Sequence, residues 1–200
     1  KVSDDNYFSD MSSLISATST VNLPQEANLK YSTDKLDVDL IAQRYQNLTT
    51  TSSPYERLPS LSISHLDEYE NEKGTAIYET DVNMSLTKFA RNHNFIASSS
   101  QSNTTGTRFV ANPSISMPFE ADYGYVKPKL TMNIRKYDLE GGQVNSKSMT
   151  IPTISVDSGV YLDKKLEMGG KNFVQTLEPR IFYSYTPYRN QETLPMFDTA

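Results

Sequence analysis

The chain has 200 residues, enough for one domain with a sizeable core. Its 19 basic and 24 acidic residues give a formal net charge of −5, so no basic footprint supports nucleic-acid binding. Cysteine is absent, which excludes a disulfide framework and a thiolate metal site within these residues. We expect no cofactor and no metal ion.

The composition predicts a β-rich protein. Hydrophobic residues make up 36%, and Ser, Thr, Asn and Tyr are abundant where a helical protein would use Ala, Leu, Glu and Lys. No apolar run approaches the roughly eighteen residues of a membrane helix, and no signal peptide follows Lys1. The mean hydropathy of −0.56 is still compatible with membrane-spanning strands, in which only every second residue faces lipid.

Segments with period-2 alternation, separated by clusters of Gly, Asn, Asp, Ser and Pro, predict about eight strands. The first three, at residues 23–31, 36–46 and 58–66, are the weaker ones. The clearest is 76–89, where one face is apolar and the other carries Glu79, Asp81 and Asn83. Antiparallel hairpins follow from this spacing.

Four further strands are predicted at residues 107–119, 125–137, 152–162 and 173–185. The polar face of 125–137 is cationic, and Gly169 with Gly170 supplies a hairpin turn. A proline cannot donate to its ladder, so each of the strand prolines predicts a weakened pairing, a bulge or an edge. These prolines are Pro113, Pro128, Pro152 and Pro179.

Alternation by itself does not distinguish a barrel in lipid from a soluble β-sandwich with a buried core. The strands exceed the roughly five or six residues usual in soluble sheets, and their polar faces carry charges. Tyr78, Tyr183 and Tyr185 lie near strand ends, where aromatic girdles of barrels sit. The predicted fold class is therefore all-β, a segment of about eight or more strands from a larger antiparallel transmembrane β-barrel.

Specific motifs accompany this pattern. The run Gln175-Thr-Leu-Glu-Pro-Arg180, continued by Pro187-Tyr-Arg-Asn-Gln191 and Pro195-Met-Phe-Asp198, closely resembles a signature of the LPS-assembly outer-membrane proteins, also called organic solvent tolerance proteins. Lys1-Val-Ser-Asp-Asp-Asn-Tyr-Phe8 resembles the same family, so the likeness spans the chain.

The resemblance implies a bacterial outer-membrane protein that translocates lipopolysaccharide and assembles it into the outer leaflet. The family's large barrel is plugged by an LptE-like lipoprotein, and a jellyroll domain receives lipopolysaccharide from an LptA-like periplasmic bridge. By this likeness residues 1–200 are a partial β-barrel domain that lacks the jellyroll and the first and last barrel strands. The lateral gate and the family's disulfides would also lie outside it.

Charged and polar residues on the predicted polar faces are candidates for the barrel lumen, where they would give phosphates and sugars a hydrated, partly cationic route. The alternative is ordinary solvation of a sheet face. Glu178 and Arg180 share a predicted strand face, so they could form a charge ladder with basic residues of neighbouring strands. The candidates are Glu79, Asp81, Asn83, Lys127, Lys129, Arg135, Asp157, Glu178 and Arg180.

No enzyme constellation is expected. His65 and His93 are the only histidines, and there is no Gly-x-Ser-x-Gly elbow or phosphate-binding glycine loop. A triad of His65, Asp157 and Ser158 is possible only by coincidence of the fold. Two other functions remain open, a general outer-membrane pore and a secreted β-sandwich adhesin.

Overall fold

The computed structural model describes residues 22–48, 54–72, 76–92, 104–140 and 146–198, and every regular element in these ranges is a β-strand. None of these residues forms a helix long and apolar enough to cross a membrane. The strands are β1 (Asn22–Ser32), β2 (Leu36–Asn47), β3 (Glu56–Glu70), β4 (Ala76–Ala90), β5 (Thr105–Ser116), β6 (Phe119–Ala121), β7 (Gly124–Glu140), β8 (Ser146–Val160), β9 (Leu162–Met168), β10 (Lys171–Leu177) and β11 (Arg180–Tyr185).

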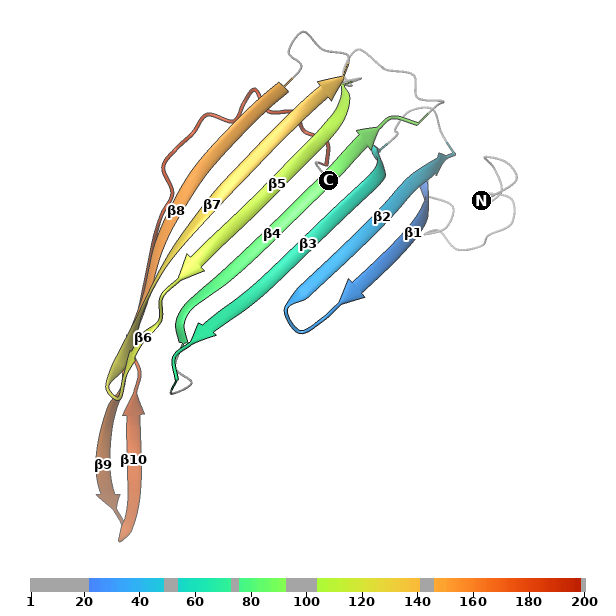
Figure 1. Ribbon diagram of the computed structural model, residues 1–200. Helices are drawn as coiled ribbons and strands as arrows, with labels where there is room; N and C mark the ends of the chain where they lie inside the picture. Colours follow the sequence, from blue (N-terminus) through green and yellow to red (C-terminus); the bar gives the residue numbers. More distant parts are fainter. Residues whose placement is uncertain (1–21, 49–53, 73–75, 93–103, 141–145, 199–200) are drawn as a thin grey trace, which may run out of the picture.

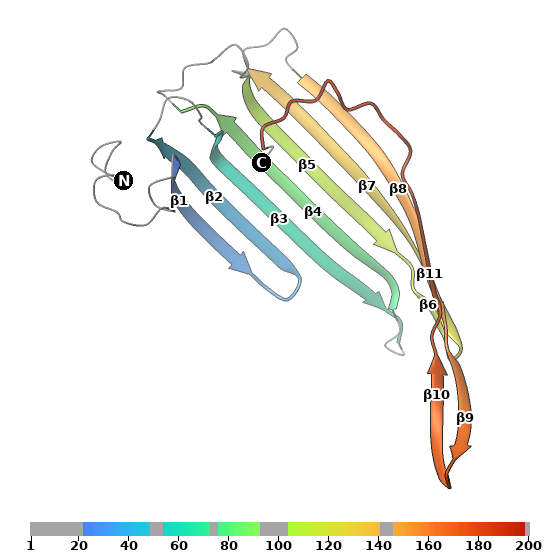
Figure 2. The same ribbon diagram turned by 180° about the vertical axis from the view of Figure 1, so that it is seen from behind.

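The main sheet is a meander of antiparallel neighbours in the order β1-β2-β3-β4-β5-β7-β8-β11, with the short β6 paired to β7 (Figures 1 and 2). β9 and β10 form a separate hairpin that extends from the end of β8 and leads into β11. Within the described residues the sheet is open, and β1 and β11 are its two edges. The predicted all-β antiparallel architecture is confirmed, while no closed barrel is formed by these residues alone.

All eight predicted strand regions contain strands, but several boundaries differ from the prediction. β8 begins at Ser146, ahead of the predicted start at Pro152. The predicted strand 107–119 ends at Ser116, before Met117 and Pro118, and 173–185 is divided into β10 and β11 at Glu178 and Pro179. At the second break the Val160 amide donates to the Pro179 carbonyl, so the chain stays beside β8 where proline interrupts the ladder.

The prolines inside strands have unequal effects. The β5–β7 register is continuous up to Ala111 opposite Ile134 and resumes at Ser114 opposite Thr131, so Pro113 lies at a gap in that ladder. Pro128 lies between the β5–β7 and β6–β7 ladders, and Pro152 lies beyond the end of the β8–β11 ladder, although both keep continuous register between β7 and β8. The predicted interruption or edge is therefore confirmed on one side of the strand at each of these three prolines.

Gly169 and Gly170 form the tight turn between β9 and β10 that their sequence predicts. Their φ angles are 62° and 74°, in the left-handed region that L side chains adopt at a cost. Consecutive glycines thus reverse the chain with no Cβ strain.

The register separates the two faces of the sheet across strand after strand. Leu40, Leu61, Leu86 and Phe109 are cross-strand partners from β2 to β5. On the opposite face Asp81, Ser114, Thr131 and Thr153 are partners from β4 to β8. The first row belongs to what we call the apolar face, the second to the polar face.

The apolar face is open to its surroundings. Leu29 is 70% exposed and Ile181 71%, at opposite edges of the sheet, and Leu130 in the middle is still 41% exposed. A contiguous apolar surface of this kind marks an interaction site, since soluble monomers rarely leave one open.

Charged pairs lie at both ends of this apolar face, with a pair of stacked tyrosines at one of them. At the end bearing β6 and the β1–β2 turn, Lys35 Nζ lies 2.5 Å from Asp67 Oδ1, and Tyr69 stacks on Tyr78 with ring centroids 5.0 Å apart. At the other end Lys88 Nζ lies 4.0 Å from Glu140 Oε1. The apolar side chains therefore form a band between two charged margins.

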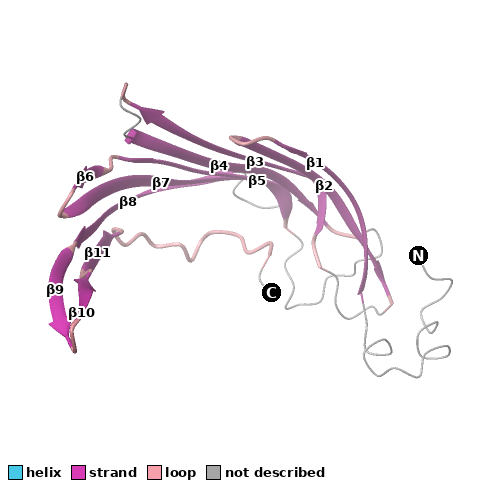
Figure 3. Cartoon of the chain, turned by 90° about the horizontal axis from the view of Figure 1, so that it is seen from below, coloured by secondary structure: helices cyan, strands magenta, loops and turns pink. Residues whose placement is uncertain are grey.

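The sheet is curved, and its polar face is the concave one. Residues 186–198, which we call the strap, leave β11 and run beneath the arch (Figure 3). The strap contacts polar-face residues of the middle strands, including Arg108 and Phe89. Phe89, Tyr137 and the strap residue Phe197 form the buried hydrophobic cluster, so the core of this segment lies inside the arch.

Candidate functional site

A row of alternating charges crosses the polar face near the end that bears β6. Glu79 of β4 accepts a hydrogen bond from Lys127 Nζ of β7 at 2.6 Å and another from Ser116 Oγ of β5 at 3.0 Å. Asp157 of β8 is held by the Arg180 guanidinium of β11, whose Nε lies 2.7 Å away and whose terminal nitrogen binds the second carboxylate oxygen. Strand register places these four charges side by side.

Tyr125 extends this row, since its hydroxyl donates to Asp157 Oδ1 at 3.2 Å. Its ring lies against Gly159, where an added Cβ would come within 2.5 Å of the ring. Glycine at this position therefore makes room for the tyrosine beside the Arg180–Asp157 pair.

The ion pairs of the row are solvated, because the side chains of Lys127 and Glu79 are 36% and 28% exposed and that of Arg180 is 65% exposed. Exposed pairs of this type contribute little to stability, because water and salt screen them. Their main effect is to give the concave surface a dense, fixed pattern of charge.

The other candidate residues from the sequence have the following positions. Asp81 and Asn83 lie on the polar face of β4, with Asn83 Nδ2 donating to Asp81 at 2.6 Å. Lys129 lies opposite Ser116 and Ser155 on the same face. Glu178 lies in the break between β10 and β11, so the strand face predicted for Glu178 with Arg180 is not formed. Arg180 pairs instead with Asp157, an acidic partner that the ladder prediction did not name.

The strap is fixed on the polar face at the other end of the sheet. Arg108 of β5 binds the Asp198 carboxylate with both terminal nitrogens, at 2.8 and 2.7 Å. Lys147 of β8 donates to the Thr193 carbonyl, and the hydroxyls of Thr153 and Thr186 are 2.8 Å apart. Three points of attachment thus hold the strap from its start to its end.

Phe197 fills an aromatic box made by Tyr55, Phe89 and Tyr137. Its ring stacks on Phe89 with centroids 4.5 Å apart and meets Tyr55 edge-on at 5.1 Å. Phe197 is 5% exposed and Phe89 1%. Burying an aromatic side chain in this way stabilises the attachment by about 2–3 kcal/mol.

A polar cavity of about 300 Å³ lies between strap and sheet. It is lined by Asn133, Arg135, Met149, Ile151, Thr153, Thr186 and Gln191. The Arg135 guanidinium has no hydrogen-bond or ion-pair partner within the described ranges. The cavity therefore combines a free cation with amide and hydroxyl groups.

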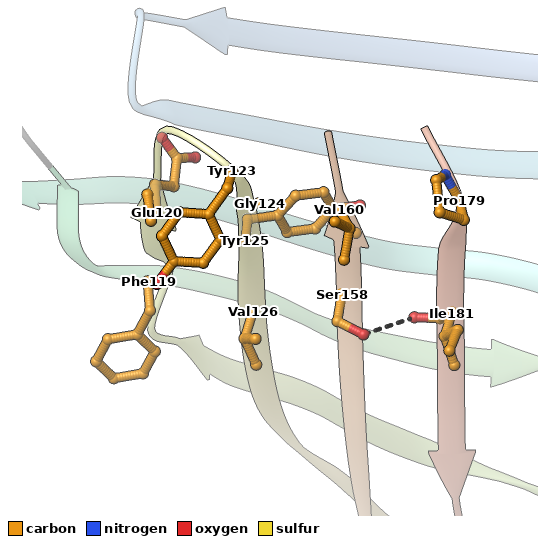
Figure 4. A pocket seen from close by; sticks show the side chains of 12 residues that line it. Phe119, Glu120, Tyr123, Gly124, Tyr125, Val126, Ser158, Val160, Pro179 and Ile181 are labelled. Atoms are coloured by element: carbon orange, nitrogen blue, oxygen red, sulfur yellow. Dashed lines mark hydrogen bonds between the residues drawn. The ribbon is translucent and has the colours of Figure 1, made fainter. Parts of the chain in front are cut away.

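A second hollow, of about 490 Å³, is apolar and lies at the junction of β6, β7, β8 and β11 (Figure 4). Phe119, Val126, Val160 and Ile181 contribute to its wall, and Ser158 Oγ donates to the Ile181 carbonyl at 3.5 Å. This groove continues the apolar face and offers space for hydrocarbon.

The structure does not assemble the histidine triad. His65 lies on β3 and Asp157 on β8, with β4, β5 and β7 between them. Among the described residues no group of three or more His, Cys, Asp or Glu side chains could hold a metal ion. The N-terminal motif at residues 1–8 lies outside the described residues.

Comparison with known proteins gives one consistent family. The family model described as "LptD: LPS transport system D" matches residues 1–200. Proteins named LPS-assembly protein LptD from Nitrosomonas eutropha and Thiobacillus denitrificans are each 34% identical over the whole chain, and one from Pseudomonas aeruginosa is 32% identical. The chain covers 28%, 26% and 24% of these three relatives, so it spans about a quarter of their length.

Proposed function

The chain belongs to the family described as LptD: LPS transport system D, and from this premise we propose that it forms part of the wall of an outer-membrane barrel. In this proposal residues 1–200 are a partial β-barrel domain, and neighbouring strands of a longer protein pair with the edges of β1 and β11. The apolar face meets lipid, and the polar face lines a hydrated lumen.

One observation carries the proposal: the polar face is concave and the apolar face is exposed and convex (Figure 3). A soluble β-sandwich requires the opposite, because its apolar face must be covered by a second layer. The charged margins at both ends of the apolar band match the two membrane–water interfaces. The apolar groove beside β6 would be filled by acyl chains.

Spin labels placed one at a time along β7 test this arrangement in the full-length protein in lipid vesicles. Cysteine at Leu130, Met132 and Ile134 is expected to give labels that collide with oxygen dissolved in lipid and not with a water-soluble nickel complex. Labels at Lys129, Thr131 and Asn133 are expected to show the reverse. Labels at the first three positions that are shielded from both reagents would indicate a buried core and exclude the barrel wall.

For the barrel as a whole we propose translocation of lipopolysaccharide and its assembly into the outer leaflet, with an LptE-like plug lipoprotein and an LptA-like bridge as partners. The role of the relatives, which are LPS-assembly proteins by name, supports this proposal. The charged row and the basic residues beyond it would give the phosphates and sugars of lipopolysaccharide a wet path beside the lipid-facing wall.

Charge reversal on the polar face tests the transport role. Replacing Lys127, Lys129 and Arg135 by Glu in the full-length protein is expected to slow the arrival of new lipopolysaccharide at the cell surface several-fold. Lys136 is the matched control, because it follows Arg135 on β7 and its side chain lies on the opposite face of the sheet. Unchanged lipopolysaccharide arrival with altered uptake of small solutes would instead favour a general outer-membrane pore.

A further inference from the structure

Three basic side chains surround Tyr137 on the polar face. Arg108 of β5 and Lys147 of β8 are its cross-strand partners on either side. Arg135 lies two residues earlier on β7, and therefore on the same face. We call Arg108, Arg135 and Lys147 the cationic patch.

The strap itself occupies two of these three cations. Asp198 supplies a carboxylate to Arg108, and the Thr193 carbonyl accepts from Lys147. Arg135, beneath the strap in the polar cavity, has no such partner among the described residues. The patch is thus partly satisfied by groups of the strap and partly vacant.

We propose that the cationic patch is a binding site for a phosphate-bearing saccharide and that the strap is its internal competitor. Phosphate oxygens of the ligand take the place of Asp198 on Arg108, bind Arg135, and compete with the Thr193 carbonyl for Lys147. The side-chain amide of Gln191 and the amide oxygen of Asn133, whose Nδ2 already donates to Ile151 and Thr153, offer hydrogen bonds to sugar hydroxyls. This inference rests on the proposed function, which places the polar face along the route of lipopolysaccharide.

The chemistry favours such an exchange. Arginine binds phosphate and carboxylate with the same two-nitrogen geometry, so either anion satisfies Arg108. A saccharide with several phosphates can bind several cations at once, whereas the strap offers one carboxylate to the patch. Phe197 keeps Asp198 close to Arg108, which raises its effective concentration and makes it a strong competitor despite its single charge.

The test uses the full-length protein in detergent or nanodiscs and measures binding of deacylated lipopolysaccharide that retains its phosphates. The same saccharide after removal of its phosphates serves as the second probe. Wild-type protein is expected to bind the phosphorylated probe at least about fivefold more tightly, with an affinity that falls as salt is added.

Single substitutions separate the ligand from its competitor. Arg135→Gln is expected to weaken binding of the phosphorylated probe about fivefold, while Lys136→Gln, on the opposite face of β7, leaves the affinity unchanged. Asp198→Asn removes the competing charge and keeps every cation, so it is expected to tighten binding about threefold. A site in which the strap has only a structural role would not show this gain.

The proposal is overturned if the two probes bind equally, if neither binds, or if Asp198→Asn does not tighten binding. The spin-label pattern along β7 is independent of all three results. Lack of saccharide binding with a normal lipid-facing pattern would therefore remove the patch and leave the proposed barrel wall intact.

Discussion

The carboxyl of Asp198 has a setting unlike that of a free side chain in solution. It lies in the strap, outside the strands, and the hydrogen bonds and positive charge of Arg108 hold the pKa of its carboxyl below the ordinary value of 3.8. Arg57 of β3 adds a further positive charge, and burial acts in the opposite direction. The carboxylate is therefore favoured while the strap is attached.

This setting predicts that the strap is released in acid. A carboxyl whose pKa is lowered by attachment stabilises the attached state fully above its free pKa, and the stabilisation is lost as the pH falls through the lowered pKa. A nitroxide at Met196→Cys, a position 75% exposed, should therefore stay immobile above the ordinary carboxyl pKa of 3.8 and become mobile as the pH falls through the lowered pKa. The measurement is the spectrum of the nitroxide between pH 7 and pH 2.

A label at Tyr123→Cys, in the turn before β7, controls for general loss of structure. In Asp198→Asn the strap label should lose most of its pH dependence. The same pH dependence of the strap label in wild-type protein and in Asp198→Asn would contradict the role of Asp198 as the anchor.

The position of a residue in the candidate site could be predicted from the sequence where it depends on alternation within one strand, and not where it depends on a distant partner. Lys127, Lys129 and Arg135 follow from alternation along one strand, and the structure places all three on the polar face. Arg108 and Asp198 are 90 positions apart, and the alternation of apolar and polar residues does not indicate that they are in contact. The only signal was the family-like Pro195–Asp198 motif, which gave no contact partner.

Among the elements, β7 shows most clearly how a strand can serve two environments. Its middle alternates between Leu130, which faces Ile115 and Ile154, and Thr131, which faces Ser114 and Thr153. A shift of one residue would exchange the two faces, so the register of β7 is strongly determined.

We predict a large difference between arginine substitutions at these two adjacent positions. Leu130→Arg should lower the free energy of unfolding of the protein in lipid vesicles by about 2–4 kcal/mol, which is the cost of a cation on the lipid face near mid-bilayer. Thr131→Arg should cost less than about 1 kcal/mol, because the polar face is hydrated. Both values come from denaturant titration of the full-length protein; equal costs at the two positions would contradict the assignment of the faces.

The positions of the strands could be predicted because each strand has its own alternation. The points at which strands are interrupted could be predicted only in part. The sequence places Pro179 inside a strand, yet whether the chain would bend away or remain beside β8 depended on the Val160 amide on another strand. Similarly, Pro113 breaks the ladder on the β7 side while its pairing with Val82 on the β4 side persists. Such effects depend on neighbours that alternation does not identify.

At the scale of the whole molecule, the two unpaired edges dominate the behaviour expected of this segment. β1 and β11 present free backbone groups along their outer sides in the described sheet. An open edge next to an exposed apolar face promotes association with other chains. From the proposed barrel wall we therefore expect the segment to need lipid and further strands to remain unassociated.

Residues 1–200 produced alone should consequently aggregate in buffer without detergent. Light scattering after dilution from denaturant measures this, and detergent micelles should reduce the scattering because they cover the apolar face. A monomer in plain buffer with one cooperative thermal transition would indicate the β-sandwich adhesin and contradict the barrel wall.

The sequence predicted two chemically different faces but could not predict the direction in which the sheet curves. Alternation is identical for a convex and a concave polar face. The direction is seen only in the arrangement of segments that are distant in sequence, with Phe197 packed against Tyr55 and Phe89 on the concave side. The same contacts hold the strap, which follows the last strand that alternation predicts.

The path of the strap also limits how far the wall can deform. It starts at the edge strand β11 and ends at Arg108 in the middle of the sheet, so it spans the arch as a chord. An extended chain reaches at most about 3.5 Å per residue. Residues 186–198 therefore set a maximum separation between their two ends, and a wall that flattened to widen its interior would first have to detach Asp198. The width of the arch and the attachment of the strap are in this way mechanically linked.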